Sequence, residues 1–212
     1  MHPSLERDLS IQAEKRFLSG VREADRYFMG ESNVHEALER LVDRLAELKI
    51  PYAIVGALSL NAYGYQRTTN NISVLLRRED LESFKKAHLG RGYVDKFPGS
   101  KGFRDATQNV DIDVLLTGEY PGDGKEKPIA FPDPAEAAVR GDRFSLLPLS
   151  TLLKLKLASG MTAPHRLRDL ADVIELIRIN GLGEDLADSL HPYVREKFHE
   201  LWQAAQVSDS EE

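Results

Sequence analysis

The sequence predicts an α/β fold: a small mixed sheet flanked by helices, with a helical C-terminal part. Segments with helical apolar spacing alternate with short apolar runs as far as residue 116. Glycine and proline bound these runs, as at Pro51, Gly56 and Gly90, which is typical of strand and helix ends. From Pro148 onward the pattern is mostly helical.

The predicted elements follow in chain order. Helices are expected over 4–28 and 33–49, the second with Ser32 or Asn33 as N-cap and this apolar stripe: Leu38, Leu41, Val42, Leu45 and Leu48. Strands are expected over 52–55, 72–76 and 110–116, with weaker ones near 92–96 and 102–106. Further helices are expected over 57–63, 79–89, 149–158, 165–180 and 191–206.

A long connection follows the last strand. Residues 118–134 are rich in glycine and proline, which predicts an irregular loop or a hairpin turning at Asp123-Gly124. The length of 212 residues favours a single domain. We expect a core over 33–147, a helical C-terminal subregion over 148–206 and an N-terminal helical extension over 1–30. That extension is long enough to pack against a second copy of the chain or a protein partner.

Composition narrows the function classes. The net charge is −6 and no long Lys/Arg cluster stands out, which argues against bulk nucleic-acid binding. The absence of cysteine excludes disulfides and thiolate metal sites and favours a reducing compartment. Because the chain has neither a signal-like start nor an apolar run of ~20 residues, we expect a cytoplasmic protein without membrane spans.

The strand-turn-helix-strand unit YAIVGALSLNAYGYQRTTNNISVLL, residues 52–76, resembles the signature of the minimal nucleotidyltransferases and the related AbiEii-type toxin enzymes. The resemblance continues through FRDATQNVDIDVLLTG, LPLSTLLKLKLASG and HRLRDLADVIEL, and it covers roughly residues 35–180. In that family a strand leads into Gly-Gly or Gly-Ser, a helix follows, and the next strand carries Asp-x-Asp. A later strand supplies a third acidic residue.

The family pattern has a clear physical basis. Residues i and i+2 of a strand share a face, so two carboxylates spaced in this way can hold Mg²⁺ against a nucleoside triphosphate (NTP). A third carboxylate completes a two-metal site, and the glycine turn lets backbone N–H groups approach the phosphates. The resemblance therefore implies Mg²⁺, an NTP substrate, and transfer of a nucleoside monophosphate to a hydroxyl group.

This chain departs from the pattern at three positions. Asn71 and Ser73 stand where the family has its two aspartates, and Ala57 replaces the second glycine after Gly56. Only the later acid is retained, as Asp113. Neutral oxygens replace carboxylates poorly around a divalent cation, so turnover should fall by orders of magnitude. We expect a catalytically impaired or inactive member that keeps weak nucleotide binding through Gly56, Ala57 and a basic residue, Arg67.

Two alternatives remain. Asp111 and Asp113 form an Asp-x-Asp of their own and could rebuild a metal site in an active enzyme; otherwise Asp111 is a solvent-facing residue. The third hypothesis is a non-enzymatic interaction module. Under the first two, Gly56, Asn71, Ser73 and Asp113 should line one cleft.

Lys156 is a further candidate site residue. It falls inside the apolar stripe of its helix, whereas Lys154 falls on the opposite face, and it matches a lysine position of the family. Its expected partner is Asp113 or a triphosphate, with snorkelling to solvent as the alternative. Arg67 could instead form a structural salt bridge, and Arg168 with Asp169 is predicted to be a surface charge pair.

Overall fold

A computed structural model of the chain describes residues 33–141 and 143–207. The predicted helix 4–28 and the extension 1–30 lie outside these residues. The described chain divides into two compact units. The first comprises 33–117 and 132–147, and the second comprises the connection 118–131 together with 148–207. The expectation of a single domain stays a prediction.

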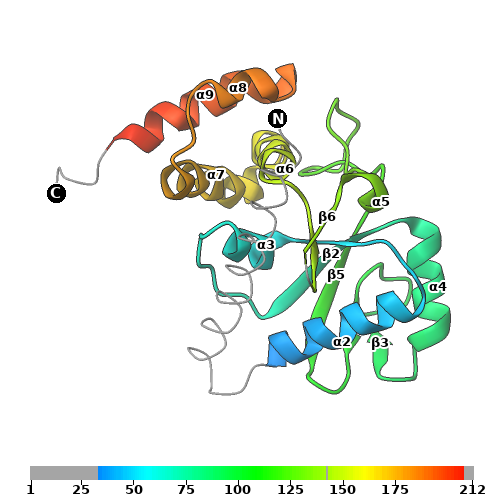
Figure 1. The fold of residues 1–212 in the computed structure, drawn as a ribbon. Coiled ribbons are helices and arrows are strands. Elements are labelled where there is room, and N and C mark those ends of the chain that lie inside the picture. The colour runs from blue at the N-terminus through cyan, green and yellow to red at the C-terminus, as the bar shows by residue number, and fades with distance from the viewer. Residues whose placement is uncertain (1–32, 142, 208–212) are drawn as a thin grey trace. The chain divides into compact units, whose positions relative to one another are not determined.

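The first unit is built on a seven-stranded mixed sheet, which confirms the predicted fold class (Figure 1). Its strands are β1 (Ala53–Val55), β2 (Asn71–Leu76), β3 (Tyr93–Asp95), β4 (Phe103–Asp105), β5 (Val110–Leu116), β6 (Val139–Arg140) and β7 (Ser145–Leu146). Their spatial order is β3-β4-β5-β2-β1-β7-β6. The pairs β2–β5 and β1–β7 are parallel and the others antiparallel. β6 and β7 were not predicted, because two residues are too few to show a period.

Four helices belong to this unit: α2 (Asn33–Glu47), α3 (Gly56–Ala62), α4 (Arg78–His88) and α5 (Pro134–Ala137). The predicted stripe of α2 is buried, except for Leu48, which is exposed because the helix ends at Glu47 and the chain turns at Lys49 (φ 56°). The apolar side chains of α2 and α4 form one core cluster with alternate residues of the two central strands: Ile72, Val74, Leu76, Ile112 and Val114.

The central strands thus have one apolar face, and their other face is polar at the start of the strands and apolar farther along, at Leu75 and Leu115. β5 alternates between buried and half-buried residues along its whole length. Since side chains alternate across a strand, the residues between the core positions point to the other face. On that face lie Asn71, Ser73, Asp111 and Asp113. The sheet therefore presents polar side chains at the start of its two central parallel strands.

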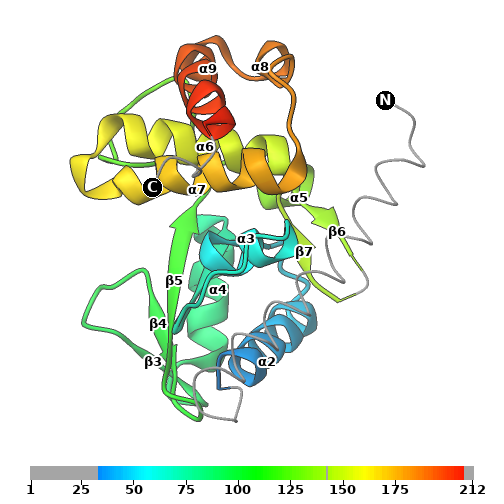
Figure 2. The same ribbon diagram turned by 90° about the vertical axis from the view of Figure 1, so that its left-hand side faces the viewer.

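The second unit is helical: α6 (Leu149–Thr162), the short η1 (Pro164–Arg166), α7 (Leu167–Asn180), α8 (Leu186–Ser189) and α9 (Pro192–Gln206). Helices α6, α7 and α9 pack on one another (Figure 2). The connection 118–131 contains no strand; Gly122 lies so close to α6 that a Cβ there would come 2.3 Å from Thr162 Oγ1. No helix among the described residues is long and apolar enough to cross a membrane.

Candidate functional site

Asn71 and Asp113 are in direct contact on the polar face of the sheet. The parallel register of β2 and β5 sets Asn71 beside Asp111 and Ser73 beside Asp113. The Asn71 side-chain amide donates to Asp113 Oδ2 at 2.5 Å, and the Thr69 hydroxyl donates to Asn71 Oδ1 at 2.6 Å. These two bonds orient the amide with its nitrogen, a donor, toward the carboxylate.

The turn after β1 meets this face through Gly56 and Ser73. Val55 pairs with Ser73 in the antiparallel register. Gly56 has φ +71°, and a Cβ there would come 2.8 Å from Ser73 Oγ. Both the left-handed backbone and the close approach require glycine. Gly56, Asn71, Ser73 and Asp113 therefore lie together, while the cleft that they were expected to line stays a prediction. Ala57 follows half-buried in the first turn of α3.

Lys96 reaches the same group of side chains, and the sequence did not predict it. Its Nζ lies 2.9 Å from Asp113 Oδ1 and 3.2 Å from Asp111 Oδ2. The hydrogen bond to Asp113 is the main cause that raises the pKa of Lys96, and the Asp111 carboxylate adds to it against the opposing effect of burial. Lys96 follows β3 directly. No motif marks it, and only the strand order β3-β4-β5 brings it here.

Arg104 binds the other side of Asp111. It lies on β4, opposite Asp111 in the antiparallel register, and its Nε donates to Asp111 Oδ1 at 2.6 Å. Arg104 lowers the pKa of Asp111 most, and Lys96 lowers it further, against a smaller effect of burial. Asp111 is therefore neither a lone solvent-facing residue nor one half of an open carboxylate pair. We call Asn71, Ser73, Lys96, Arg104, Asp111 and Asp113 the strand-face cluster.

The strand-face cluster does not fit the Mg²⁺ that the family resemblance implies. A divalent cation takes several oxygen ligands, with carboxylates supplying the charge. Asn71 turns its N–H rather than its oxygen toward Asp113, and Lys96 already bridges both carboxylates. The described residues contain no group of three or more His, Cys, Asp or Glu that could hold a metal ion. The metal assignment of Asp111 and Asp113 therefore finds no support in the donor set.

Arg67 contributes its backbone to the loop between α3 and β2. Its N–H donates to Asn61 Oδ1 at 2.6 Å, and the Asn61 amide donates back to the Arg67 carbonyl at 3.3 Å. Asn61 is almost completely buried. This buried asparagine, which the sequence did not single out, fixes the path of the chain into β2. A nucleotide-binding role for the Arg67 guanidinium stays a prediction.

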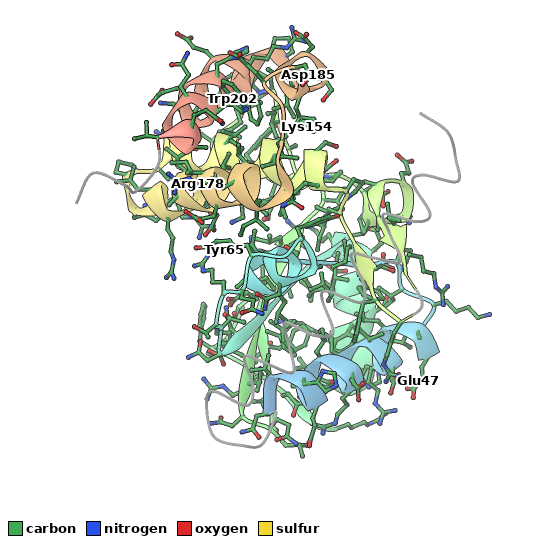
Figure 3. The ribbon with its side chains drawn as sticks, turned by 60° about the vertical axis from the view of Figure 1, so that its left-hand side comes forward. Glu47, Tyr65, Lys154, Arg178, Asp185 and Trp202 are labelled. Atoms are coloured by element: carbon green, nitrogen blue, oxygen red, sulfur yellow. The ribbon has the colours of Figure 1, made fainter. Side chains whose placement is uncertain are left out.

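Lys156 points inward from α6, as predicted, but its anions differ from the expected ones. Its Nζ lies 3.0 Å from Asp169 Oδ1 and 2.7 Å from Asp172 Oδ2, both on α7. The assignment of Lys156 to Asp113 or a phosphate is therefore corrected to a salt bridge within the helical unit. Lys154, labelled in Figure 3, is half-buried instead of plainly exposed, because α6 buries side chains around most of its circumference.

Asp169 is buried, so the predicted surface pair with Arg168 is wrong. Its Oδ2 accepts hydrogen bonds from Ser159 Oγ at 2.6 Å and Arg166 Nε at 2.8 Å. Burial alone would raise the pKa of Asp169, but Lys156, Ser159 and Arg166 together lower it below its ordinary value. We call Lys156, Ser159, Arg166, Asp169 and Asp172 the helical cluster. In the sequence, this cluster was indicated by the i, i+3 spacings Lys156–Ser159 and Asp169–Asp172, which place each pair side by side on one helix.

A cavity of about 350 Å³ in the helical unit offers no comparable chemistry. It is lined by Ile177, Arg178, Gly181, Leu182, Trp202, Ala205 and Gln206. Arg178 and Trp202 are labelled in Figure 3. Arg178 donates to the carbonyls of Ala205 and Val207, and the Trp202 indole donates to Leu182 O. These bonds tie the end of α9 to α7 and its following loop. The lining contains neither a carboxylate nor a nucleophile.

Comparison with known proteins gives little beyond the fold. No protein-family model matches the chain, and no curated protein matches its sequence. Among solved structures, the chain resembles the crystal structure of ANT(2'')-Ia in complex with adenylyl-2''-tobramycin, with 11% identity and a TM-score of 0.47 over 81% of this chain and 98% of that one. It also resembles the solution structure of the antibiotic-resistance factor ANT(2'')-Ia, with 13% identity and a TM-score of 0.45 over 81% and 93%. That protein is an aminoglycoside nucleotidyltransferase, and likeness at this level carries no conclusion about the activity of this chain.

Proposed function

We propose that this chain is a nucleotidyltransferase-fold protein that does not catalyse metal-dependent nucleotidyl transfer and that binds an NTP weakly and without metal. The fold assignment is supported by the chain's own topology. β1, the Gly56 turn, α3 and β2 follow in the order of the family signature, and β5 supplies the retained acid beside β2.

One observation carries the proposal for activity: the Asn71 amide donates to Asp113 at the position where the family has a metal-binding carboxylate. The Asn71 N–H already forms a hydrogen bond with this acid, and unlike a carboxylate it provides no oxygen ligand for a cation. The alternative of an active enzyme that uses Asp111 and Asp113 would require both carboxylates to be free for a metal. Their contacts with Lys96 and Arg104 argue against it.

Weak NTP binding is the remaining part of the proposal. The Gly56 turn lacks a side chain and leads directly into α3, so its backbone N–H groups are where we expect the phosphates to bind. The replacement of a glycine by Ala57 should weaken this contact.

The test combines binding with turnover. The purified protein is titrated calorimetrically with each NTP in EDTA and again in Mg²⁺, and α-phosphate-labelled NTPs are followed for transfer to protein, RNA or small-molecule hydroxyls. We expect weak binding that Mg²⁺ does not strengthen, and no transfer. Mg²⁺-dependent transfer that Asp113→Asn abolishes would establish the active enzyme instead. Complete absence of NTP binding would favour the interaction module.

A further inference from the structure

We propose that Lys96 is a tethered cation: its ammonium group bridges Asp111 and Asp113 where a divalent ion would bind, balances their two charges together with Arg104, and keeps divalent ions out of the strand-face cluster. The inference rests on the proposed function, since it treats this face as a changed nucleotidyltransferase site. It adds a residue that lies outside the recognised motif and explains how two retained acids persist side by side without metal.

The first argument is that every oxygen of the two carboxylates has a donor. Asp111 Oδ1 accepts from Arg104, and Asp111 Oδ2 lies 3.2 Å from Lys96 Nζ. Asp113 Oδ1 accepts from Lys96 at 2.9 Å, and Asp113 Oδ2 accepts from Asn71. Each carboxylate oxygen can accept through a second lone pair, so these donors do not fill every position, but a cation bound to both acids would have to enter beside the groups that already hold them. Lys96 is the donor shared by both acids.

The second argument is that the fold holds Lys96 in this position. Its stem crosses Gly102, where a Cβ would come 3.0 Å from Lys96 Cδ and 2.8 Å from the carbonyl of Ile112. The loop that carries Lys96 is anchored to α4, because Lys85 Nζ binds Asp95 at 2.5 Å and also binds the carbonyl of Ser100. An exposed lysine without such support would move through many rotamers. Lys96 instead packs against Gly102 and lies on an anchored loop.

The third argument is electrostatic. A divalent cation at the two acids would lie a few ångströms from the ammonium group, and like charges at that distance repel strongly where water is partly excluded. The carboxylates also raise the pKa of Lys96, so it remains charged throughout the physiological pH range. Restoring the family acids at positions 71 and 73 should therefore restore only a weak metal site.

The experiment measures Mn²⁺ binding by calorimetry, with free Mn²⁺ followed by electron paramagnetic resonance. It compares the parent, the double variant Asn71→Asp/Ser73→Asp, and the triple variant that adds Lys96→Met. The matched control adds Lys86→Met, an exposed lysine on α4, to the same double variant. A second control adds Lys96→Arg, which keeps the charge. Thermal unfolding in EDTA confirms that each variant is folded.

We expect no saturable binding by the parent and weak binding by the double variant. The triple variant with Lys96→Met should bind Mn²⁺ at least about tenfold more tightly than the double variant, since it removes a like charge next to the bound cation. The variants with Lys86→Met or Lys96→Arg should match the double variant. Equal affinity of the double and Lys96→Met triple variants, or no binding by either, would overturn the role of Lys96. Metal-dependent transfer by the parent would instead overturn the proposed function.

Discussion

Each of the two units contains a lysine between two aspartates, and the two arrangements differ in burial. Lys96 bridges Asp111 and Asp113, whose side chains are 30% and 44% exposed. Lys156 bridges Asp169 and Asp172, which are 7% and 1% exposed. A buried charge that loses its partner is costly, whereas water and salt screen an exposed one. Replacing the lysine of the helical cluster should therefore cost much stability, whereas replacing Lys96 in the strand-face cluster should cost little.

The largest effect is expected for Lys156→Met, which keeps the length of the side chain but leaves Asp172 and Asp169 without their shared cation. Removing one partner of a buried ion pair costs about 3–5 kcal/mol, so the free energy of unfolding of the helical unit should fall by that order. Urea unfolding followed by circular dichroism measures it. Lys154→Met, on the same helix, is the control and should change little; equal effects of both variants would contradict the comparison.

A buried ion pair in the first unit tests whether burial determines the loss of stability, or whether the loss depends on which unit carries the pair. Arg40 Nη1 binds both oxygens of Asp105 at 2.8 Å, and Asp105 is fully buried. Asp105 also accepts from the N–H groups of Thr107 and Gln108, so part of its stabilisation survives without Arg40. Arg40→Ala should therefore destabilise by about 2 kcal/mol, less than Lys156→Met. If Arg40→Ala lowered the free energy of unfolding less than Arg44→Ala, the Arg40–Asp105 pair would be dispensable for stability.

The helical cluster should also produce a pH dependence. Because the pKa of Asp169 is lowered in the folded state, the unfolded chain binds more protons and stability falls as the pH falls. The contribution is fully present above the unfolded pKa of about 3.9 and is lost below it, as the pH passes the folded pKa. Asp169→Asn should be less stable at neutral pH and lose less between pH 5 and 2. If the free energy of unfolding, measured in urea, fell equally with pH in the parent and in Asp169→Asn, Asp169 would not be the source of the pH dependence.

The smallest effect on stability is expected for Lys96→Met. The partly exposed ion pairs of Lys96 should contribute no more than about 1 kcal/mol, so the unfolding midpoint should stay close to that of the parent. The same substitution should change cation binding once the acids at positions 71 and 73 are restored. A destabilisation as large as that of Lys156→Met would mean that Lys96 is a structural residue and would remove the contrast between the two clusters.

The proximity of Asn71 and Asp113 could be predicted from the sequence because it depends on strand periodicity and on the chain order of the family resemblance. Each residue lies on a clear apolar run, and alternation determines its face once the parallel pairing is assumed. Lys96 and Arg104 could not be predicted, because their positions depend on β3 and β4 pairing beside β5. Strands of three residues carry almost no periodic signal, and their order in the sheet is a non-local property.

Lys156 shows the same division between local and non-local information. The helical period correctly gave its inward orientation, since that follows from its own helix. Its partners come from α7, whose rotation about its axis depends on packing against α6 and α9. The sequence therefore predicted that an anion was needed but not which residues supplied it. Burial of Asp169 was missed for the same reason.

The most direct test of the central claim is a calorimetric titration of the parent protein and of Asn71→Asp/Ser73→Asp with Mg²⁺ in the presence of a non-hydrolysable NTP. The account predicts no saturable Mg²⁺ binding by the parent at millimolar cation, because Asn71 and Lys96 already satisfy Asp113. In the double variant, Mg²⁺ binding and its coupling to the NTP should become detectable. Tight Mg²⁺ binding by the parent that Asp113→Asn abolishes would contradict the account.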